Sequence, residues 1–329
     1  MKAIKILTMA ALATAVFASC SNDEDLAQSN YPMDNVVRII TSVDGMNTRA
    51  SYGNSTDKLN SFGFCINNAG SDKYTYDNIK PPPPPNNWNP ATQMLWQNST
   101  TAVDILAYAP YQETTEDASG KVKVFGKTDY AFSVKEDQSN AEDYSSDLIV
   151  YKQTGFKPGT ELNTSKAVDV TFTHLLSQLN LTIELRDQFN QDEKKPVTSA
   201  TVTDVKVDGT FIRSKVNFAA DPISVLRDGQ ASKAITPETV AFTKADKTTD
   251  HATFKYSAIV IPQWIMAGSF CISFKVDGTD YIWTSTSDVK FVSGKKYDLH
   301  LLVGKDVVQG SVITARPWGE ETIIEKETD

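Results

Sequence analysis

The chain has 329 residues, enough for two ordinary domains once a leader is set aside. Hydrophobic residues make up 40% of it and charged residues 22%, values typical of folded globular proteins and not of disordered ones. The formal net charge is −9, and no cluster of Lys and Arg is interleaved with aromatic residues. Nucleic acid is therefore excluded as an expected partner.

The first nineteen residues have the pattern of an export signal. Two lysines precede an apolar run over 6–17 that is too short to span a bilayer. The run ends in Phe-Ala-Ser-Cys, and small residues before a cysteine resemble the lipobox of bacterial lipoproteins, in which that cysteine becomes the lipidated first residue. We predict a signal peptide over 1–19 and a lipid on Cys20. The alternative is an ordinary signal peptide cut after Ala18.

Residues 20–34 are predicted to form an acidic tether. The run Ser-Asn-Asp-Glu-Asp at 21–25 follows the expected lipid directly, and the stretch as far as residue 34 is polar without apolar periodicity. An acidic run at this place resembles the surface-export signal of lipoproteins from the Bacteroidales. Because two or more acyl chains hold a protein stably to a membrane, these features predict an outer-membrane anchor at the cell surface.

Beyond the tether the pattern predicts β-strands almost throughout. The run over 35–43 is rich in β-branched residues, and Val37, Ile39 and Val43 are expected on one face of it. The polar, glycine-containing stretch 45–54 is expected to be an exposed loop, and the five prolines at 81–85 an extended segment without amide donors. Further strands are expected over 62–67, 101–108, 121–125, 130–134, 147–151, 167–174, 180–185, 254–261, 296–303 and 308–314.

Two Asp-Gly dipeptides stand between alternating runs and predict hairpins. The first, Asp208-Gly209, would join 202–207 to 211–218, and the second, Asp277-Gly278, would join 270–276 to 281–285. No stretch of ten residues has clean helical periodicity. Many short strands at this spacing predict an all-β fold of antiparallel β-sandwiches, which we divide into an N-terminal sandwich over 35–165 and a C-terminal sandwich over 166–329.

Residue patterns typical of catalysis or metal binding do not occur. His174, His251 and His300 lack metal-ligand spacing, and no nucleophile, zinc, calcium or phosphate-loop motif is present. Distant carboxylates such as glycosidases use cannot be recognised in a sequence. Cys65 and Cys271 are expected to be small buried hydrophobic residues, with a disulfide between them as the alternative. We predict no enzyme, no cofactor and no metal, and a partly buried His174 at a sheet bend.

Several short elements, taken in order, resemble the Bacteroidales fimbrillin-like family, the type V pilins. They are Asn-Thr-Arg-Ala at 47–50, Ala-Tyr-Ala-Pro-Tyr at 107–111, Asp-Leu-Ile at 147–149, Phe-Thr-His at 172–174, Ile-Pro-Gln at 261–263, Gly-Lys-Lys-Tyr at 294–297 and Pro-Trp at 317–318. The series covers most of the mature chain, and the five-proline run departs from it. The resemblance implies two transthyretin-like antiparallel β-sandwich domains in tandem and a chain that polymerises.

The resemblance also implies a processing step. In such pilins an Arg-specific surface protease cuts the lipidated precursor in a loop after the first strand. Carried onto this chain, the cut falls between Arg49 and Ala50 and removes both the anchor and the strand over 35–43. A neighbouring subunit's strand then fills the groove, and either 307–313 or the tail 319–329 is a candidate donor. The implied partners are other pilin subunits, the protease, the outer membrane and a host or bacterial surface receptor.

A rival hypothesis is a non-polymerising surface lipoprotein that binds glycan through exposed tryptophans. Of the five tryptophans, Trp88 beside the proline run is expected to be exposed, and Trp96, Trp264, Trp283 and Trp318 are expected in a core or an interface. An exposed coplanar pair would favour the glycan hypothesis. A strand over 35–43 that is inserted in a sandwich beside a cleavable loop would favour the pilin.

Overall fold

The computed structural model describes residues 30–43, 59–81, 93–113, 124–190, 201–229, 231–245 and 250–318. Strands make up nearly all of their regular structure, so the predicted all-β class is confirmed. The helical turns in these ranges are short: η2 (Asp72–Tyr74), α1 (Pro158–Glu161) and η3 (Asp187–Asn190). Within the described ranges, no helix has the length and apolar character needed to cross a membrane.

A six-stranded lower sheet holds the first part of the chain. Its strands are β1 (Ile39–Val43), β2 (Gly63–Asn67), β3 (Tyr76–Ile79), β4 (Val103–Ala109), β6 (Ile149–Phe156) and β7 (Val168–His174). Their order is β1-β7-β6-β4-β2-β3, so β1 and β3 form the two edges. Neighbouring strands are antiparallel except β1 and β7, which run parallel.

A second six-stranded sheet, the upper sheet, is built from the C-terminal half. Its strands are β8 (Ser177–Leu185), β13 (Glu238–Thr243), β14 (Ala252–Val260), β19 (Lys295–Val303), β20 (Val308–Gly310) and β21 (Thr314–Pro317). They follow the order β13-β14-β8-β19-β20, and β21 also pairs with β19. Along β8, buried Leu and Ile side chains alternate with half-buried polar ones, as expected of a strand with one face in a core.

Three smaller sheets complete the fold. A four-stranded sheet of order β12-β9-β16-β17 consists of β9 (Val202–Thr210), β12 (Lys233–Ile235), β16 (Cys271–Val276) and β17 (Thr279–Thr284). A three-stranded sheet of order β11-β10-β5 consists of β5 (Tyr130–Ser133), β10 (Arg213–Asn217) and β11 (Ser224–Arg227). The last is a pair of strands, β15 (Gln263–Ile265) and β18 (Val289–Phe291).

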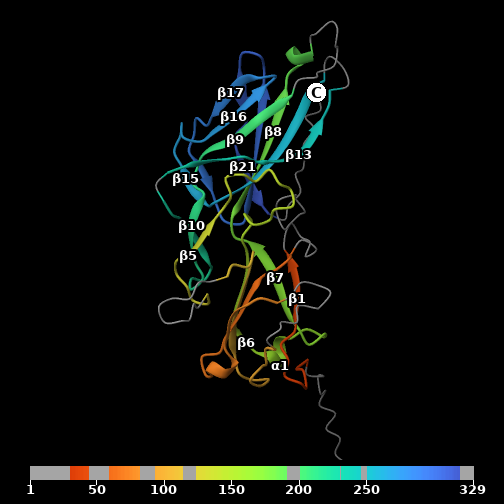
Figure 1. Ribbon diagram of the computed structural model, residues 1–329, viewed down its shortest axis with the longest axis vertical. Coiled ribbons are helices and arrows are strands. Elements are labelled where there is room, and N and C mark those ends of the chain that lie inside the picture. Colours follow the sequence, from red (N-terminus) through yellow and green to blue (C-terminus); the bar gives the residue numbers. More distant parts are fainter. Residues whose placement is uncertain are drawn as a thin grey trace, which may run out of the picture.

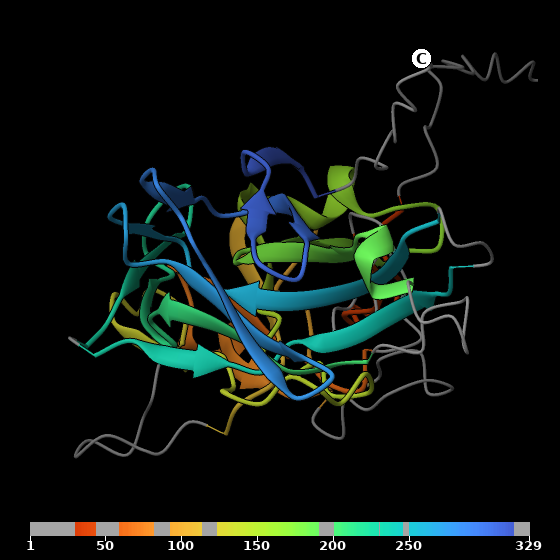
Figure 2. The ribbon, with the colours of Figure 1, turned by 90° about the horizontal axis from the view of Figure 1, so that it is seen from above.

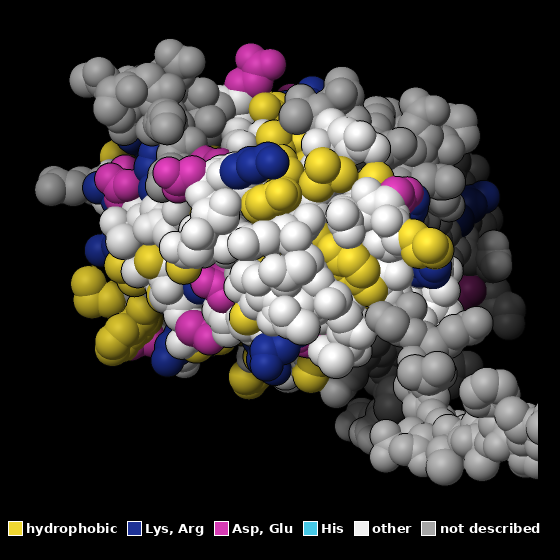
Figure 3. All heavy atoms as spheres, turned by 90° about the horizontal axis from the view of Figure 1, so that it is seen from below, with side chains coloured by type: hydrophobic (Ala, Val, Ile, Leu, Met, Phe, Trp, Pro, Cys, Tyr) yellow, Lys and Arg dark blue, Asp and Glu magenta, His cyan; other side chains and the backbone are white. Residues whose placement is uncertain are grey.

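The sheets form an elongated molecule with a lower and an upper part. In Figure 1, β1, β6, β7 and α1 lie at the lower end, β8, β9, β13, β16 and β17 lie in the upper part, and β5, β10 and β15 lie between them at the left. Apolar residues of the upper and the four-stranded sheet share one core, and Figure 2 shows the strands of the upper part layered over one another. Seen from below, in Figure 3, the lower end presents small groups of hydrophobic side chains among uncharged polar ones.

The lower sheet is covered on both faces. On one face Val37, Ile39 and Val43 join a core with Phe62 and Trp96 from the segments that flank β2 and β4. On the other face, Tyr108 and its neighbours pack against β5 and β10 and continue into the core of the upper part. Tyr108 also explains why residue 63 is a glycine, because a Cβ at that position would lie 2.2 Å from the Tyr108 ring.

Strands from both sides of the predicted domain boundary at residue 165 pair in the same sheets. β7 follows that boundary but pairs with β1 and β6, and β10 pairs with β5 of the N-terminal half. Between His174 and Ser177 the chain passes from the lower to the upper sheet, which accounts for the break in alternation seen in the sequence there. The division into two domains stays a prediction, and the residues of each part are not continuous in the sequence.

One predicted hairpin is correct and the other is wrong. β16 and β17 pair across Asp277-Gly278, where both residues have positive φ as a type I′ turn requires. β9 and β10 do not pair, since β9 continues to Thr210 and bonds β12 and β16. Gly209 is needed for another reason: a Cβ there would lie 1.9 Å from the Ser269 carbonyl oxygen.

Two further strand predictions need correction. The described part of 121–125, which is Val124 and Phe125, leads into a turn and not a strand. The expected strand over 308–314 is two short strands, β20 and β21, which bond opposite ends of β19. Their separation lets one short segment extend along most of a nine-residue strand.

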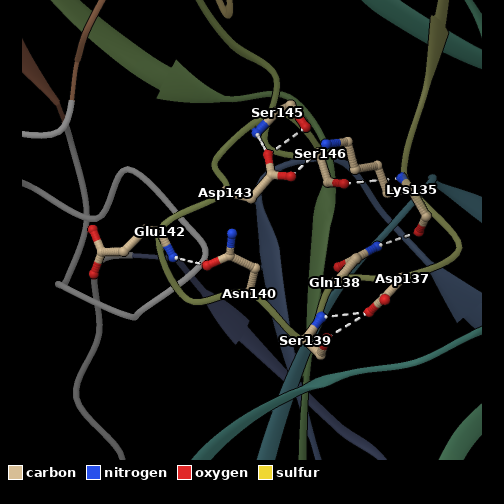
Figure 4. A network of polar contacts seen from close by, with 9 residues as sticks. All are labelled: Lys135, Asp137, Gln138, Ser139, Asn140, Glu142, Asp143, Ser145 and Ser146. Atoms are coloured by element: carbon tan, nitrogen blue, oxygen red, sulfur yellow. Dashed lines mark hydrogen bonds and ion pairs between the residues drawn. The ribbon is translucent and has the colours of Figure 1, made fainter.

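A braced loop between β5 and β6 links the two parts of the molecule. Side chains of Asp137, Asn140 and Asp143 each accept a hydrogen bond from the backbone two residues further on (Figure 4). Within this loop Gln138 is buried, and its amide bonds both the N–H and the carbonyl of Ile259 in β14, at 2.8 and 2.9 Å. The loop that leads into the lower sheet's longest strand is thereby tied to the upper sheet.

Candidate strand-exchange site

The predicted removable strand lies at an edge of the lower sheet. β1 pairs only with β7, in parallel, from Ile39 opposite Val168 to Val43 opposite Phe172. The backbone N–H of Val168 donates to the Arg38 carbonyl at 2.8 Å, and the hydroxyl of Ser42 donates to that of Thr171 at 3.0 Å. One row of ladder bonds therefore holds this strand to the sheet.

The apolar side chains of this segment fill the lower core. The exposed fractions of Val37, Ile39 and Val43 are 2%, 2% and 5%, whereas Ile40 between them is 45% exposed. The three buried side chains belong to one cluster with Phe62 and other residues of the lower sheet. The backbone of this segment thus lies at the edge of the sheet, whereas its apolar side chains are part of the lower core.

The strand is shorter than the sequence predicted. Residues 35–37 leave the sheet and bond the segment before β4 instead: the Val37 N–H donates to the Met94 carbonyl at 3.0 Å, and the Trp96 N–H donates to the Asn35 carbonyl at 2.8 Å. Asn35 has a positive φ, and the Asp34 side chain accepts the Val36 N–H, which together turn the chain into the strand.

The other predicted processing residues lie outside the described residues. These are Cys20, Arg49 and Ala50, together with most of the tether over 20–34. Position 49 comes six residues after the end of β1 at Val43, so the predicted cut directly follows the edge strand in sequence. The lipid and the cut stay predictions.

The C-terminal strands form a second loosely seated edge. β20 and β21 have three and four residues and are mostly exposed, and near them Val307 and Val312 are 47% and 84% exposed. A groove of about 1010 Å³ runs between these strands and the segment from β17 to β18. Segments with few buried side chains and a solvent-filled groove beside them separate from a sheet at low cost.

A buried cluster anchors the end of β21. The His174 ring Nδ1 lies 3.0 Å from a carboxylate oxygen of Asp147, and both side chains are fully buried. The Trp318 ring stacks on the His174 ring with centroids 3.9 Å apart. Above Trp318 lies the ammonium of Lys296, 5.6 Å from the ring centroid, and burial lowers the pKa of Lys296 to about 8.

This cluster unites residues that the sequence presented as separate landmarks. Asp147 lies two residues before β6, His174 ends β7, Lys296 lies in β19 and Trp318 follows β21. His174 was expected at a sheet bend and is found there, fully enclosed. Its contacts with Asp147 and Trp318 were missed, because residues up to 171 positions apart leave no periodic signal.

Comparison with known proteins identifies solved structures with the same fold and a family to which the chain belongs. A family model described as fimbrillin-like matches residues 48–318. The chain belongs to the fimbrillin-like family. Its proteins are structural and adhesion proteins of cell-surface fimbriae and not enzymes, so the prediction that this chain is no enzyme is confirmed. No curated protein matches the chain.

Three solved structures have the fold of this fimbrillin-like chain. A candidate cell adhesion protein of Bacteroides ovatus has a TM-score of 0.57 at 12% identity, over 87% of this chain and 99% of its own. A candidate cell adhesion protein of Bacteroides uniformis has a TM-score of 0.52 at 19% identity, with the same coverage. A fimbrial protein of Bacteroides vulgatus has a TM-score of 0.53 at 14% identity, over 86% and 99%.

Titratable groups elsewhere in this fimbrillin-like chain do not form a metal centre. No group of three or more metal-ligating side chains suited to an ion occurs in the described ranges. Glu184 contacts both His251 and His300, an arrangement across β8, β14 and β19 that their distant sequence positions concealed. The disulfide alternative fails, since Cys65 and Cys271 are both free, and burial raises the thiol pKa of Cys65.

The tryptophans separate into core residues and one surface residue. Trp96 and Trp318 are buried, Trp283 is half-buried and Trp88 lies outside the described residues. Trp264 was expected in a core or an interface but is 65% exposed. Its neighbours along β15 are buried, but the inward residues are a polar glutamine and an isoleucine, so the sequence carries no alternation that shows it. No coplanar pair of exposed tryptophans occurs among the described residues.

Proposed function

We propose that the chain is a fimbrial structural subunit that polymerises by strand exchange. It is exported as a precursor with a lipid on Cys20, held at the outer membrane and cut after Arg49 by an Arg-specific protease. The cut releases the anchor and the segment that contains β1. A strand of a neighbouring subunit takes the place of β1, and the resulting fimbrium serves adhesion.

The observation that carries this proposal is the position of β1. It is an edge strand, so among the described residues its departure breaks one ladder, with β7, and the bonds of Asn35 and Val37 to the segment before β4. Its buried side chains, however, complete the lower core. Burial of a Val or Ile side chain is worth about 1.5–3 kcal/mol, so loss of Val37, Ile39 and Val43 leaves a groove that is unstable by several kcal/mol. Such a groove binds a replacement strand tightly.

The C-terminal strands are the donor that fits best. β20 and β21 are an edge of the upper sheet, with exposed valines on either side of β20. If β20 and β21 leave the sheet, Trp318 is the main buried side chain that loses its contacts. The segment 307–317 is eleven residues long, which is enough to pair along the five residues vacated by β1.

Limited proteolysis of the purified precursor tests the proposal. Trypsin at low dose should give a new N-terminus at Ala50, followed by a ladder of oligomers on unheated gels that collapses on boiling. In the Lys58→Ala background, which removes the second tryptic site of this stretch, the Arg49→Ala precursor should remain lipid-bound and monomeric. Lys58→Ala is the matched control: it removes another tryptic site of the same 44–58 stretch and should oligomerise like the parent.

Two results would count against strand exchange. The first is cleavage at Arg49 without any higher oligomer. The second is oligomers from the Arg49→Ala chain in the same yield as from the parent. Intact-mass measurement of the precursor checks the lipid separately, because Cys20→Ser should lose the acyl mass and the membrane fraction but keep the tryptic cut.

A further inference from the structure

An aromatic groove lies beside the strand pair of β15 and β18. It has a volume of about 710 Å³ and lies between β11 and β15. Its apolar wall includes Phe211 and Ile265, and Leu226, Trp264 and Met266 form an exposed rim, with exposed fractions of 68%, 65% and 72%. In Figure 1, β15 lies at the left and β1 at the lower right.

The Trp264 ring is held in place before any ligand arrives. Its indole N–H donates to a carboxylate oxygen of Asp288 at 3.0 Å, and the other oxygen of that carboxylate accepts the Ala267 N–H at 2.9 Å. The strand pair places Trp264 opposite Lys290, with Gln263 and Ile265 on either side turned inward. Because the ring is already fixed, stacking on it costs little conformational entropy.

The floor of the groove is equally rigid. The Gln263 amide is buried and bonds both the N–H and the carbonyl of Phe211, at 2.9 and 3.2 Å. The Arg227 guanidinium lies 4.3 Å from the centre of the Phe211 ring, a cation–π contact at the wall of the groove. The groove is therefore formed in advance and does not need to be induced.

The charge of the groove indicates which class of ligand it can bind. Among the described residues that line the groove, Arg227 alone is charged, and no described acidic residue forms an ion pair with it. The hydroxyls of Ser232 and Ser269 are exposed at the same groove. A planar guanidinium pairs well with a carboxylate, and an exposed indole prefers a flat apolar face. A pyranose ring that bears a carboxylate presents both, with hydroxyls for the serines.

We propose that this groove binds a carboxylated sugar, a sialic or uronic acid residue of a surface glycan, by stacking on Trp264 and pairing with Arg227. The proposal gives the adhesion in the proposed function a ligand class, and it rests on that function only for the surface location. It does not require cleavage or polymerisation.

Binding is measured on the full-length Arg49→Ala chain, which excludes polymerisation from the result. The probes are 3′-sialyllactose, a glucuronic acid-containing hyaluronan tetrasaccharide and the neutral control lactose. Saturation-transfer NMR and calorimetry should show binding of at least one acidic probe, with saturation on ring protons, and at least tenfold weaker binding of lactose.

Two variants and their matched controls separate the contacts. Trp264→Ala should abolish binding, and Arg227→Gln should reduce the affinity for the acidic probe at least tenfold, to that of lactose. Phe242→Ala and Lys255→Gln remove an exposed aromatic and an exposed cation elsewhere and should bind like the parent. Since all four side chains are exposed, equal thermal unfolding temperatures verify the fold.

The proposal is wrong if neither acidic probe binds the parent chain, or if Trp264→Ala binds as the parent does. Equal affinity for lactose and the acidic probes, unchanged by Arg227→Gln, would also overturn the assignment of a carboxylate. Because the Arg49→Ala chain is used throughout, these failures are independent of whether the processed chain polymerises.

Discussion

At the scale of single residues, the least expected group is Lys296. It lies in β19 with 2% of its surface exposed, above the Trp318 ring. Burial is the main reason that its pKa falls from 10.5 to about 8, and the nearby Arg316 charge adds to the effect. A lysine stem packs well against an aromatic ring, but its ammonium loses hydration there.

We predict a pH dependence of stability from this residue. The folded chain releases the Lys296 proton near pH 8 and the unfolded chain only near 10.5. Between these values unfolding takes up a proton, so the free energy of unfolding gains a contribution that rises with pH. Lys296→Met should be more stable than the parent at pH 7.5, and the difference should shrink by pH 9.5.

Urea unfolding at pH 7.5, 8.5 and 9.5 measures this difference. Comparing variant and parent at each pH cancels other titrating groups, including Cys65, whose raised thiol pKa acts in the opposite direction. Lys295→Met, one residue away, is the control and should show no such convergence. A constant difference between Lys296→Met and parent across these pH values would contradict the prediction.

At the scale of elements, acceptor and donor lie in different sheets. β1 can leave the lower sheet while β20 and β21 stay on β19, and the converse also holds. A chain that lacks its C-terminal strands therefore keeps an acceptor and loses its donor. This separation of roles allows the two halves of the proposed exchange to be tested apart.

We predict that a chain ending at Gly304 and cut at Arg49 stays monomeric by itself. Mixed with cut full-length chain, it should be incorporated as a terminating subunit and shift the gel ladder to shorter oligomers in proportion to its fraction. Incorporation also shows that the shortened chain is folded. A shortened chain that forms long oligomers alone would exclude the C-terminal strands as donors.

At the scale of the whole molecule, a buried polar contact adds to the apolar core that joins the lower and upper parts. Gln138 reaches from the β5–β6 loop to the backbone of Ile259 in β14, and both ends of its amide are used. An alanine there leaves a buried N–H and a buried carbonyl without partners. Each such loss costs about 1–3 kcal/mol.

Gln138→Ala should therefore lower the free energy of unfolding by about 2–6 kcal/mol, the sum of the two losses, and speed amide exchange at Ile259. Urea unfolding and hydrogen-exchange mass spectrometry measure the two effects. Ser139→Ala removes an exposed hydroxyl of the same loop, next along the chain, and is the control. Unchanged exchange at Ile259 in Gln138→Ala would show that the two parts are held together without this bond.

Local chemistry in the sequence determined the all-β class, most strand positions and the buried face of Val37, Ile39 and Val43. Alternation, β-branched residues and the Asp277-Gly278 turn act between neighbours, so they can be recognised without a fold. The order of landmarks along the chain likewise pointed to the family, which the match over 48–318 then showed.

Only the tertiary structure decided what depends on distant partners. Asp208-Gly209 resembles a hairpin turn, yet β9 runs through it because β16 offers a better partner and the Ser269 carbonyl needs the space. The edge position of β1, the crossing of the predicted domain boundary and the stacking of Trp318 on His174 also join residues far apart in sequence. Sheet order is a choice among many pairings of similar local energy, and only the complete core selects one of them.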